Sequence, residues 1–138
     1  VTLNFGRRPA ARDLPTIAQV TAAFNAMRSE GGLTTPAPDP VYTAGAQAGA
    51  DAMARGADEA DVAKAEAATM QREVDRLRTS RTGSCVVRVE LLELMQLKQL
   101  KLALSPQLQR YGIGARLHQD EKGSRLSTVV MLEGVPCR

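Results

Sequence analysis

The sequence predicts an α+β fold in which an Ala-rich helical N-terminal half with a Pro-rich spacer precedes a small C-terminal unit of a strand, a helix and a β-hairpin. Three observations predict this class: apolar side chains recur at helical spacing from Ile17 to Met27, alanine dominates residues 43–80, and two strand-like runs near the C-terminal end flank a polar loop. Bulky aliphatic side chains are sparse over residues 34–68 and dense over residues 86–132. Because alanine removes little apolar area from water, we expect the core to lie in the C-terminal half.

Residues 1–42 are predicted to form an arm, a short helix and a Pro-rich spacer. The run from Asp13 to Thr16 contains helix-start residues, since proline is tolerated in a first turn and aspartate or threonine can cap it. Four apolar side chains then follow at the spacing of one helix face: Ile17, Val20, Phe24 and Met27. Two glycines end the helix, and alternating prolines predict an extended spacer over residues 33–42.

Residues 43–80 are predicted to form an Ala-rich helical segment. Glycines weaken its first part, and a firmer helix is expected to begin at Asp58 or Asp61, either of which can cap it. A stripe at heptad-like spacing follows: Ala60, Ala63, Ala67, Met70, Val74 and Leu77. A stripe made mainly of alanine buries little area, so we expect this helix to lie against a partner chain or against the C-terminal half of its own chain.

Residues 81–138 are predicted to form a small α+β unit that ends in a β-hairpin. Adjacent β-branched residues indicate a strand over residues 85–90. The stretch from Leu91 to Leu104 fits a helix and a strand, with its length and residue types favouring helix, and a short helix is expected from Ser105 to Gly112. The hairpin consists of strands over residues 113–119 and 125–132, joined by a polar loop that contains a glycine.

Composition and cysteine content set few limits on function. The chain has 138 residues, the length of one ordinary domain, and its net charge of +3 permits nucleic-acid contact without arguing for it. No run of 18 apolar residues is present, so we expect no membrane-spanning segment. Cys85 and Cys137 lie outside any metal-binding spacing, and both alternatives, a disulfide between them or two free thiols, remain open.

Residues with catalytic chemistry are few and isolated. His118, the one histidine, lies in the first strand of the predicted hairpin without a second ligand or a carboxylate at a typical spacing. Glu90 and Glu93 fit the polar side of an amphipathic helix. The pair Gly112 and Gly114 lacks the third glycine and the following helix of a dinucleotide site. We therefore predict no catalytic, cofactor-binding or metal-binding residue, and we expect a protein that is not an enzyme.

The sequence supports two functional hypotheses. In the first, the chain is a soluble, non-enzymatic structural or interaction subunit of a larger protein assembly, such as a viral particle, a secretion machine or an organellar complex. Its expected partners are other protein chains, copies of itself included. Nine side chains form the predicted partner interface: Ile17, Val20, Phe24, Met27, Ala63, Ala67, Met70, Val74 and Leu77.

The second hypothesis is a nucleic-acid-binding protein. The order of predicted elements after residue 58 is similar to that of a winged helix-turn-helix, although the segment from Ser105 to Gly112 gives the recognition helix little more than one turn. Four basic side chains would lie near phosphates: Arg110, Arg116, Lys122 and Arg125.

Overall fold

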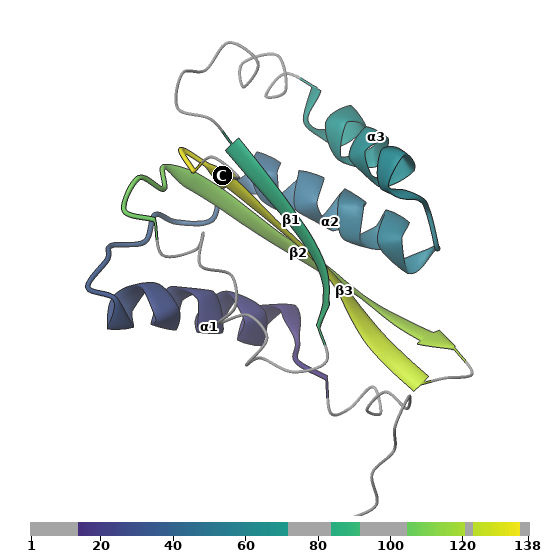
Figure 1. Cartoon of the computed structure of the whole chain (residues 1–138), viewed down its shortest axis with the longest axis horizontal. Coiled ribbons are helices and arrows are strands. Elements are labelled where there is room, and N and C mark those ends of the chain that lie inside the picture. The colour runs from purple at the N-terminus through teal and green to yellow at the C-terminus, as the bar shows by residue number, and fades with distance from the viewer. Residues whose placement is uncertain (1–13, 72–83, 92–104, 121–122, 136–138) are drawn as a thin grey trace, which may run out of the picture.

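The computed structural model describes residues 14–71, 84–91, 105–120 and 123–135 (Figure 1). The elements, in chain order, are α1 (Ile17–Glu30), α2 (Pro40–Ala54), α3 (Glu59–Thr69), β1 (Ser84–Leu91), β2 (Arg110–Asp120) and β3 (Gly123–Glu133). Helices come first and strands last, so the predicted α+β class is confirmed.

The three strands form one antiparallel sheet in the order β1-β3-β2. The predicted hairpin is confirmed, and its strands are longer than expected, because β2 and β3 pair continuously from Arg110↔Glu133 to Asp120↔Gly123. The predicted strand after residue 84 is confirmed as β1, which pairs with β3 from Ser84↔Glu133 onward. Alternate residues of each strand point to opposite faces, so the sheet presents two surfaces for the helices.

Helix α1 covers one face of the sheet (Figure 1). Thr16 caps α1 by accepting from the Gln19 backbone, and Gln19 reaches back to complete a capping box. Phe24 stacks on Tyr111 of β2 with ring centroids 4.7 Å apart. The buried core on this side consists of Val20, Phe24, Met27, Leu108, Tyr111, Ile113, Leu126, Val130, Leu132 and Val135.

Helix α2 packs on the opposite face, where glycines replace side chains at the contact (Figure 1). A Cβ atom at Gly112 would lie closer than 3.0 Å to backbone atoms of Tyr42, and one at Gly114 would lie as close to the backbone of Ala46 and Gln47. The helix backbone thus rests almost directly on β2. The buried core on this side consists of Tyr42, Ala46, Ala50, Met70, Val129 and Met131.

Helix α3 packs beside α2, near β1 and on the same face of the sheet (Figure 1). Gly45 and Gly49 of α2 leave room for Met70 and Glu66, because a Cβ atom on either glycine would overlap those side chains. The Glu66 carboxylate accepts hydrogen bonds from Nε and Nη2 of Arg88 on β1, the first at 3.0 Å. The N-cap is Asp58, one of the two predicted residues.

Two local expectations were wrong in detail. Pro40 is not part of an extended spacer but the first residue of α2, where proline is tolerated because its missing N–H would have no partner within the helix. The segment from Ser105 to Gly112 is not a helix: it forms a turn and then enters β2 at Arg110. The ambiguous residues beyond Leu91, up to 104, lie outside the part of the chain that the structure describes.

Candidate functional site

An apolar groove lies between α1 and the edge of β2. Its volume is about 490 Å³. The lining residues, which define what we call the α1 groove, are Ile17, Ala18, Thr21, Ala22, Asn25, Pro38, Thr43, Tyr111 and Ile113. The volume falls within the 300–1,000 Å³ that is typical of ligand and side-chain pockets.

The floor of the α1 groove is fixed by buried side chains. Tyr111 is 1% exposed, and its hydroxyl donates to Oδ1 of Asn25 at 3.2 Å. Burial raises the pKa of Tyr111 above its usual value, against a smaller opposing effect of the hydrogen bond with Asn25 and of the Arg28 charge. The phenol is therefore held neutral at physiological pH and acts as a rigid wall.

Behind this floor, Arg28 is anchored at the end of α1. Its side chain donates to the carbonyl oxygens of Ser105 at 2.9 Å and Thr34 at 2.7 Å. Burial lowers the pKa of Arg28, with a smaller opposing effect from Tyr111. The two carbonyl partners compensate for part of the lost hydration and tie the end of α1 to the segment before β2.

The free edge of β2 is covered in two places. The Asp39 N–H donates to the Tyr111 carbonyl at 2.8 Å. The Gln47 side-chain amide pairs with both backbone groups of Ala115, donating to its carbonyl at 2.7 Å and accepting from its N–H at 3.2 Å. These contacts satisfy edge groups that would otherwise attract a strand from another chain. The α1 groove therefore lies beside a sheet edge whose backbone groups are already partly hydrogen-bonded.

The rim of the α1 groove is formed by exposed residues of α1. Ile17 is 40% exposed, which makes it one of the exposed large hydrophobic residues of the described chain. Ala18 and Ala22 are also exposed and lie on the same side of the helix, one turn apart. Their small side chains leave the helix backbone accessible to an approaching chain.

The predicted interface residues of α1 divide between core and surface. Val20 and Phe24 are fully buried and Met27 is 8% exposed, all three against the sheet of their own chain. These three side chains therefore find in the β-hairpin of their own chain the apolar surface that the sequence led us to seek in another molecule. Ile17, the fourth residue of the stripe, does reach the surface.

The predicted stripe on the Ala-rich helix is out of phase with the observed packing. The buried positions of α3 and its C-cap are Val62, Glu66 and Met70, one turn apart. Met70 is thus buried within the chain, whereas Ala63 is exposed and Ala67 is half-buried. Val74 and Leu77 lie outside the described residues. The phase was missed because Glu66 looked like a surface residue, while its partner, Arg88, lies 22 positions further on.

The residues predicted to contact nucleic acid do not form one patch. Arg110 lies at the start of β2, 3.8 Å from the buried carboxylate of Glu133. Arg116 and Arg125 lie towards the hairpin end of the same sheet face, in adjacent rows of the register. Lys122 lies outside the described residues.

The structure places the remaining reactive groups in structural roles. Glu133 is 2% exposed and accepts from the Tyr42 hydroxyl at 2.5 Å, which fixes α2 to β3. Cys85 is buried and disulfide-bonded; the sequence has one other cysteine, Cys137, which lies outside the described residues. Among the described residues no group of three or more potential metal ligands is found. None of the described helices combines the length and the apolar character needed to cross a membrane.

Sequence reasoning missed most of the α1 groove. Ala18, Ala22 and Asn25 recur at helical spacing beside the large apolar stripe, and this second row of small residues was the available indication. Comparison of the chain with known protein families, with curated protein sequences and with solved structures finds no significant match.

Proposed function

We propose that the chain is a non-enzymatic structural or interaction subunit of a larger protein assembly, and that it contacts another chain through the α1 groove. One observation carries the proposal: an apolar groove with an exposed isoleucine on its rim lies between a helix and a sheet edge. Exposed apolar groups that line a concavity favour association, because covering them removes apolar area from water.

The shape of the α1 groove favours an apolar anchor side chain from a partner protein. The walls are largely aliphatic, and the polar groups at its base are Thr21, Asn25 and Thr43. Asn25 Oδ1 is already engaged by Tyr111, so its amide nitrogen remains to donate to a partner carbonyl. Binding energy in protein interfaces concentrates in such anchors, which enter a pocket and are surrounded by a polar rim.

The alternative, a winged-helix nucleic-acid binder, is less well supported. It requires a recognition helix between Ser105 and Gly112, where the structure has a turn and the first residues of β2. Among the described basic side chains proposed to contact phosphates, Arg110 lies at the start of β2, apart from Arg116 of β2 and Arg125 of β3, which lie nearer the hairpin turn. We therefore retain the assembly subunit as the proposed function.

Site-specific photo-crosslinking in cells that make the protein tests the proposal. A photoreactive amino acid at Ala26, an exposed position of α1 one turn after Ala22 that does not itself line the α1 groove, is expected to give a discrete crosslinked band. The same residue at Ala68, an exposed position of α3, is the matched control and is expected to give none. Mass spectrometry of the band then distinguishes a different chain from a second copy of this one.

A second measurement separates docking from misfolding. Ile17→Asp should abolish the crosslink from position 26 while leaving the far-UV circular dichroism and the unfolding midpoint close to those of the wild type, since Ile17 is 40% exposed. Equal crosslinking from positions 26 and 68, or an unchanged band in the Ile17→Asp variant, would refute the proposed interface.

A further inference from the structure

A second cleft lies between the C-terminal end of α2 and the hairpin half of β2. Its volume is about 320 Å³. The lining residues, which define what we call the basic cleft, are Asp51, Ala54, Arg55, Arg116, Leu117 and His118. It is separate from the α1 groove, which contacts β2 at Tyr111 and Ile113.

The arginines of the basic cleft are only weakly neutralised. Arg55 is exposed and forms no ion pair with any residue that the structure describes. Arg116 approaches Asp51 to 3.9 Å with 64% of its side chain exposed, a separation and exposure at which an ion pair contributes little. The Asp51 carboxylate also accepts from the Gln47 amide at 3.0 Å, which occupies part of its acceptor capacity. The cleft therefore offers two guanidinium groups with spare donors.

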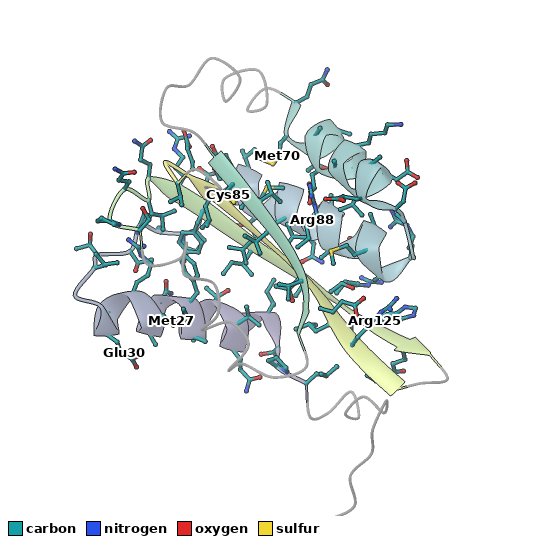
Figure 2. The ribbon with its side chains drawn as sticks, in the orientation of Figure 1. Met27, Glu30, Met70, Cys85, Arg88 and Arg125 are labelled. Carbon is teal, nitrogen blue, oxygen red and sulfur yellow. The ribbon has the colours of Figure 1, made fainter. Side chains whose placement is uncertain are left out.

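Further donors lie in the adjacent row of the sheet. Arg116 is paired in register with Ser127, and His118 with Arg125, so all four side chains share the face that carries α2. Nε of Arg125 and Oγ of Ser127 are buried and have no hydrogen-bond partner among the described residues. Arg125, which is labelled in Figure 2, also contacts Glu90 at 3.2 Å through Nη1. Buried donors without partners are uncommon in folded proteins, but these two side chains lie beside the basic cleft and do not line it, so the two guanidinium groups of Arg55 and Arg116 carry the argument.

We propose that the basic cleft binds an oxyanion of the phosphate class. Arg55 approaches from the end of a helix and Arg116 from a strand, so their planar donor forks can bind different oxygens of one tetrahedral group. A carboxylate, with two oxygens in one plane, fits such divergent donors less well. Two sources share this chemistry, a free phosphate or small phosphate ester and the backbone of a nucleic acid.

The cleft is open to solvent and contains an opposing carboxylate, so the expected affinity is modest. Charge-assisted hydrogen bonds contribute about 1.5–3 kcal/mol each, so losing one guanidinium is expected to weaken binding about tenfold or more. A dissociation constant in the range of about 1 mM corresponds to two such contacts after the cost of immobilising the ligand. Removing the charge of Asp51 should tighten binding, since it removes repulsion at short range.

Titration of the full chain followed by amide NMR shifts tests the proposal. Inorganic phosphate is added at constant ionic strength against sodium chloride, and we expect saturable shifts at residues 54–55 and 116–118. Arg55→Gln and Arg116→Gln should each weaken binding about tenfold, and Asp51→Asn should strengthen it. Lys64→Gln, which removes one exposed positive charge from α3, is the matched control and should leave the affinity unchanged.

A second arm identifies the source of the phosphate. A short single-stranded oligonucleotide that shifts the same amides, binds more tightly than inorganic phosphate and loses affinity in both arginine variants would assign the cleft to a nucleic-acid backbone. Binding of phosphate without the oligonucleotide would assign it to a small ligand. Shifts that match those in chloride, or equal losses in the Lys64 and arginine variants, would overturn the proposal, because they indicate nonspecific screening.

Discussion

Gly114 is where α2 approaches the sheet most closely, so Gly114→Ala tests the proposed packing directly. The added Cβ would lie closer than 3.0 Å to backbone atoms of Ala46 and Gln47, and ordinary contact begins at 3.4 Å. Backbone atoms cannot rotate away as a side-chain tip can. Helix α2 must therefore shift away from β2, or β2 must bend.

The expected loss of stability has two components. Overpacking of a close contact costs about 1–3 kcal/mol. A shift of α2 also lengthens both hydrogen bonds between Gln47 and the Ala115 backbone, and leaving such groups unsatisfied costs about 1–3 kcal/mol. Together we expect a loss of about 2–6 kcal/mol, a large part of the stability of an ordinary domain.

Urea unfolding followed by circular dichroism measures this loss, with Gly56→Ala as the matched control. Gly56 has φ of 82°, and a Cβ there would meet no atom within 4 Å. That change should cost about 1–2 kcal/mol from the backbone conformation alone. A Gly114→Ala variant as stable as the wild type, or no less stable than Gly56→Ala, would refute the close approach of α2 to β2.

Other consequences of the fold are testable by the same unfolding assay and by titration. Glu66→Met should destabilise the fold by about 2–3 kcal/mol, because it leaves Arg88 without its main partner. The double variant Glu66→Met with Arg88→Met should lose less stability than either single variant. A double variant whose loss equals the sum of the two single losses would contradict the coupling. The pKa of Tyr111 is raised, so the stability that this tyrosine contributes is complete below the unfolded pKa of about 10 and is lost as the pH rises through the folded pKa. In a Tyr42→Phe variant Tyr111 is the remaining tyrosine, and its tyrosinate absorbance should appear at a higher pH in the folded protein than in the unfolded protein. Coincident titration curves would oppose this assignment. Reduction of the disulfide of Cys85 should lower stability by about 4 kcal/mol, the value for a loop of about fifty residues closed with the chain's other cysteine. An unchanged unfolding midpoint in reductant would argue against this stabilisation.

Short sequence patterns predicted the helices, caps and turns that depend on residues close together in the sequence. The helix at 17–30 follows from its apolar spacing, and the hairpin from two β-rich runs around a glycine that adopts φ of 117° at position 123. The cap at Asp58 follows from its side-chain oxygen accepting from the backbone N–H of Asp61. Each of these depends on residues within a few positions of one another, so a single sequence was sufficient.

Elements that depend on distant residues were not predicted. The pair Gly112 and Gly114 does not fit a dinucleotide-binding motif. The two glycines instead allow the backbone of α2 to approach β2 closely, and this could be predicted only by knowing that α2 crosses β2. The buried state of Glu66 likewise depends on Arg88, which belongs to a strand. The basic cleft joins the end of α2 to the middle of β2, some sixty positions apart in the sequence. Contacts between residues so far apart in the sequence depend on the topology of the fold. The pattern of helices and strands in the sequence did not determine that topology.

The two sides of the sheet are packed by different means, and this asymmetry accounts for the α1 groove. On the α2 side, Gly112 and Gly114 let backbone meet backbone. On the α1 side, large side chains such as Phe24 hold the helix away from the sheet. Where the small side chains of α1 face β2 instead, at Ala18 and Ala22, nothing in the described chain fills the space, and the groove results. The sparse hydrocarbon of the N-terminal half is thus sufficient for folding because the hairpin supplies apolar side chains to both faces.

The α1 groove and the buried core have separate roles, and Ala22→Leu tests this separation. A leucine at this exposed position adds apolar carbon over the groove and should stabilise the fold slightly, by about 1 kcal/mol, because part of the added surface is buried. It should also abolish crosslinking to a partner from a photoreactive residue at position 26, since the space for an anchor side chain is then occupied. Ala68→Leu on α3 adds the same carbon atoms away from the groove and should leave the crosslink intact. If Ala22→Leu destabilised the fold by more than 1 kcal/mol, or left the crosslink unchanged, the space between α1 and β2 would not be the partner site that its lining residues indicate.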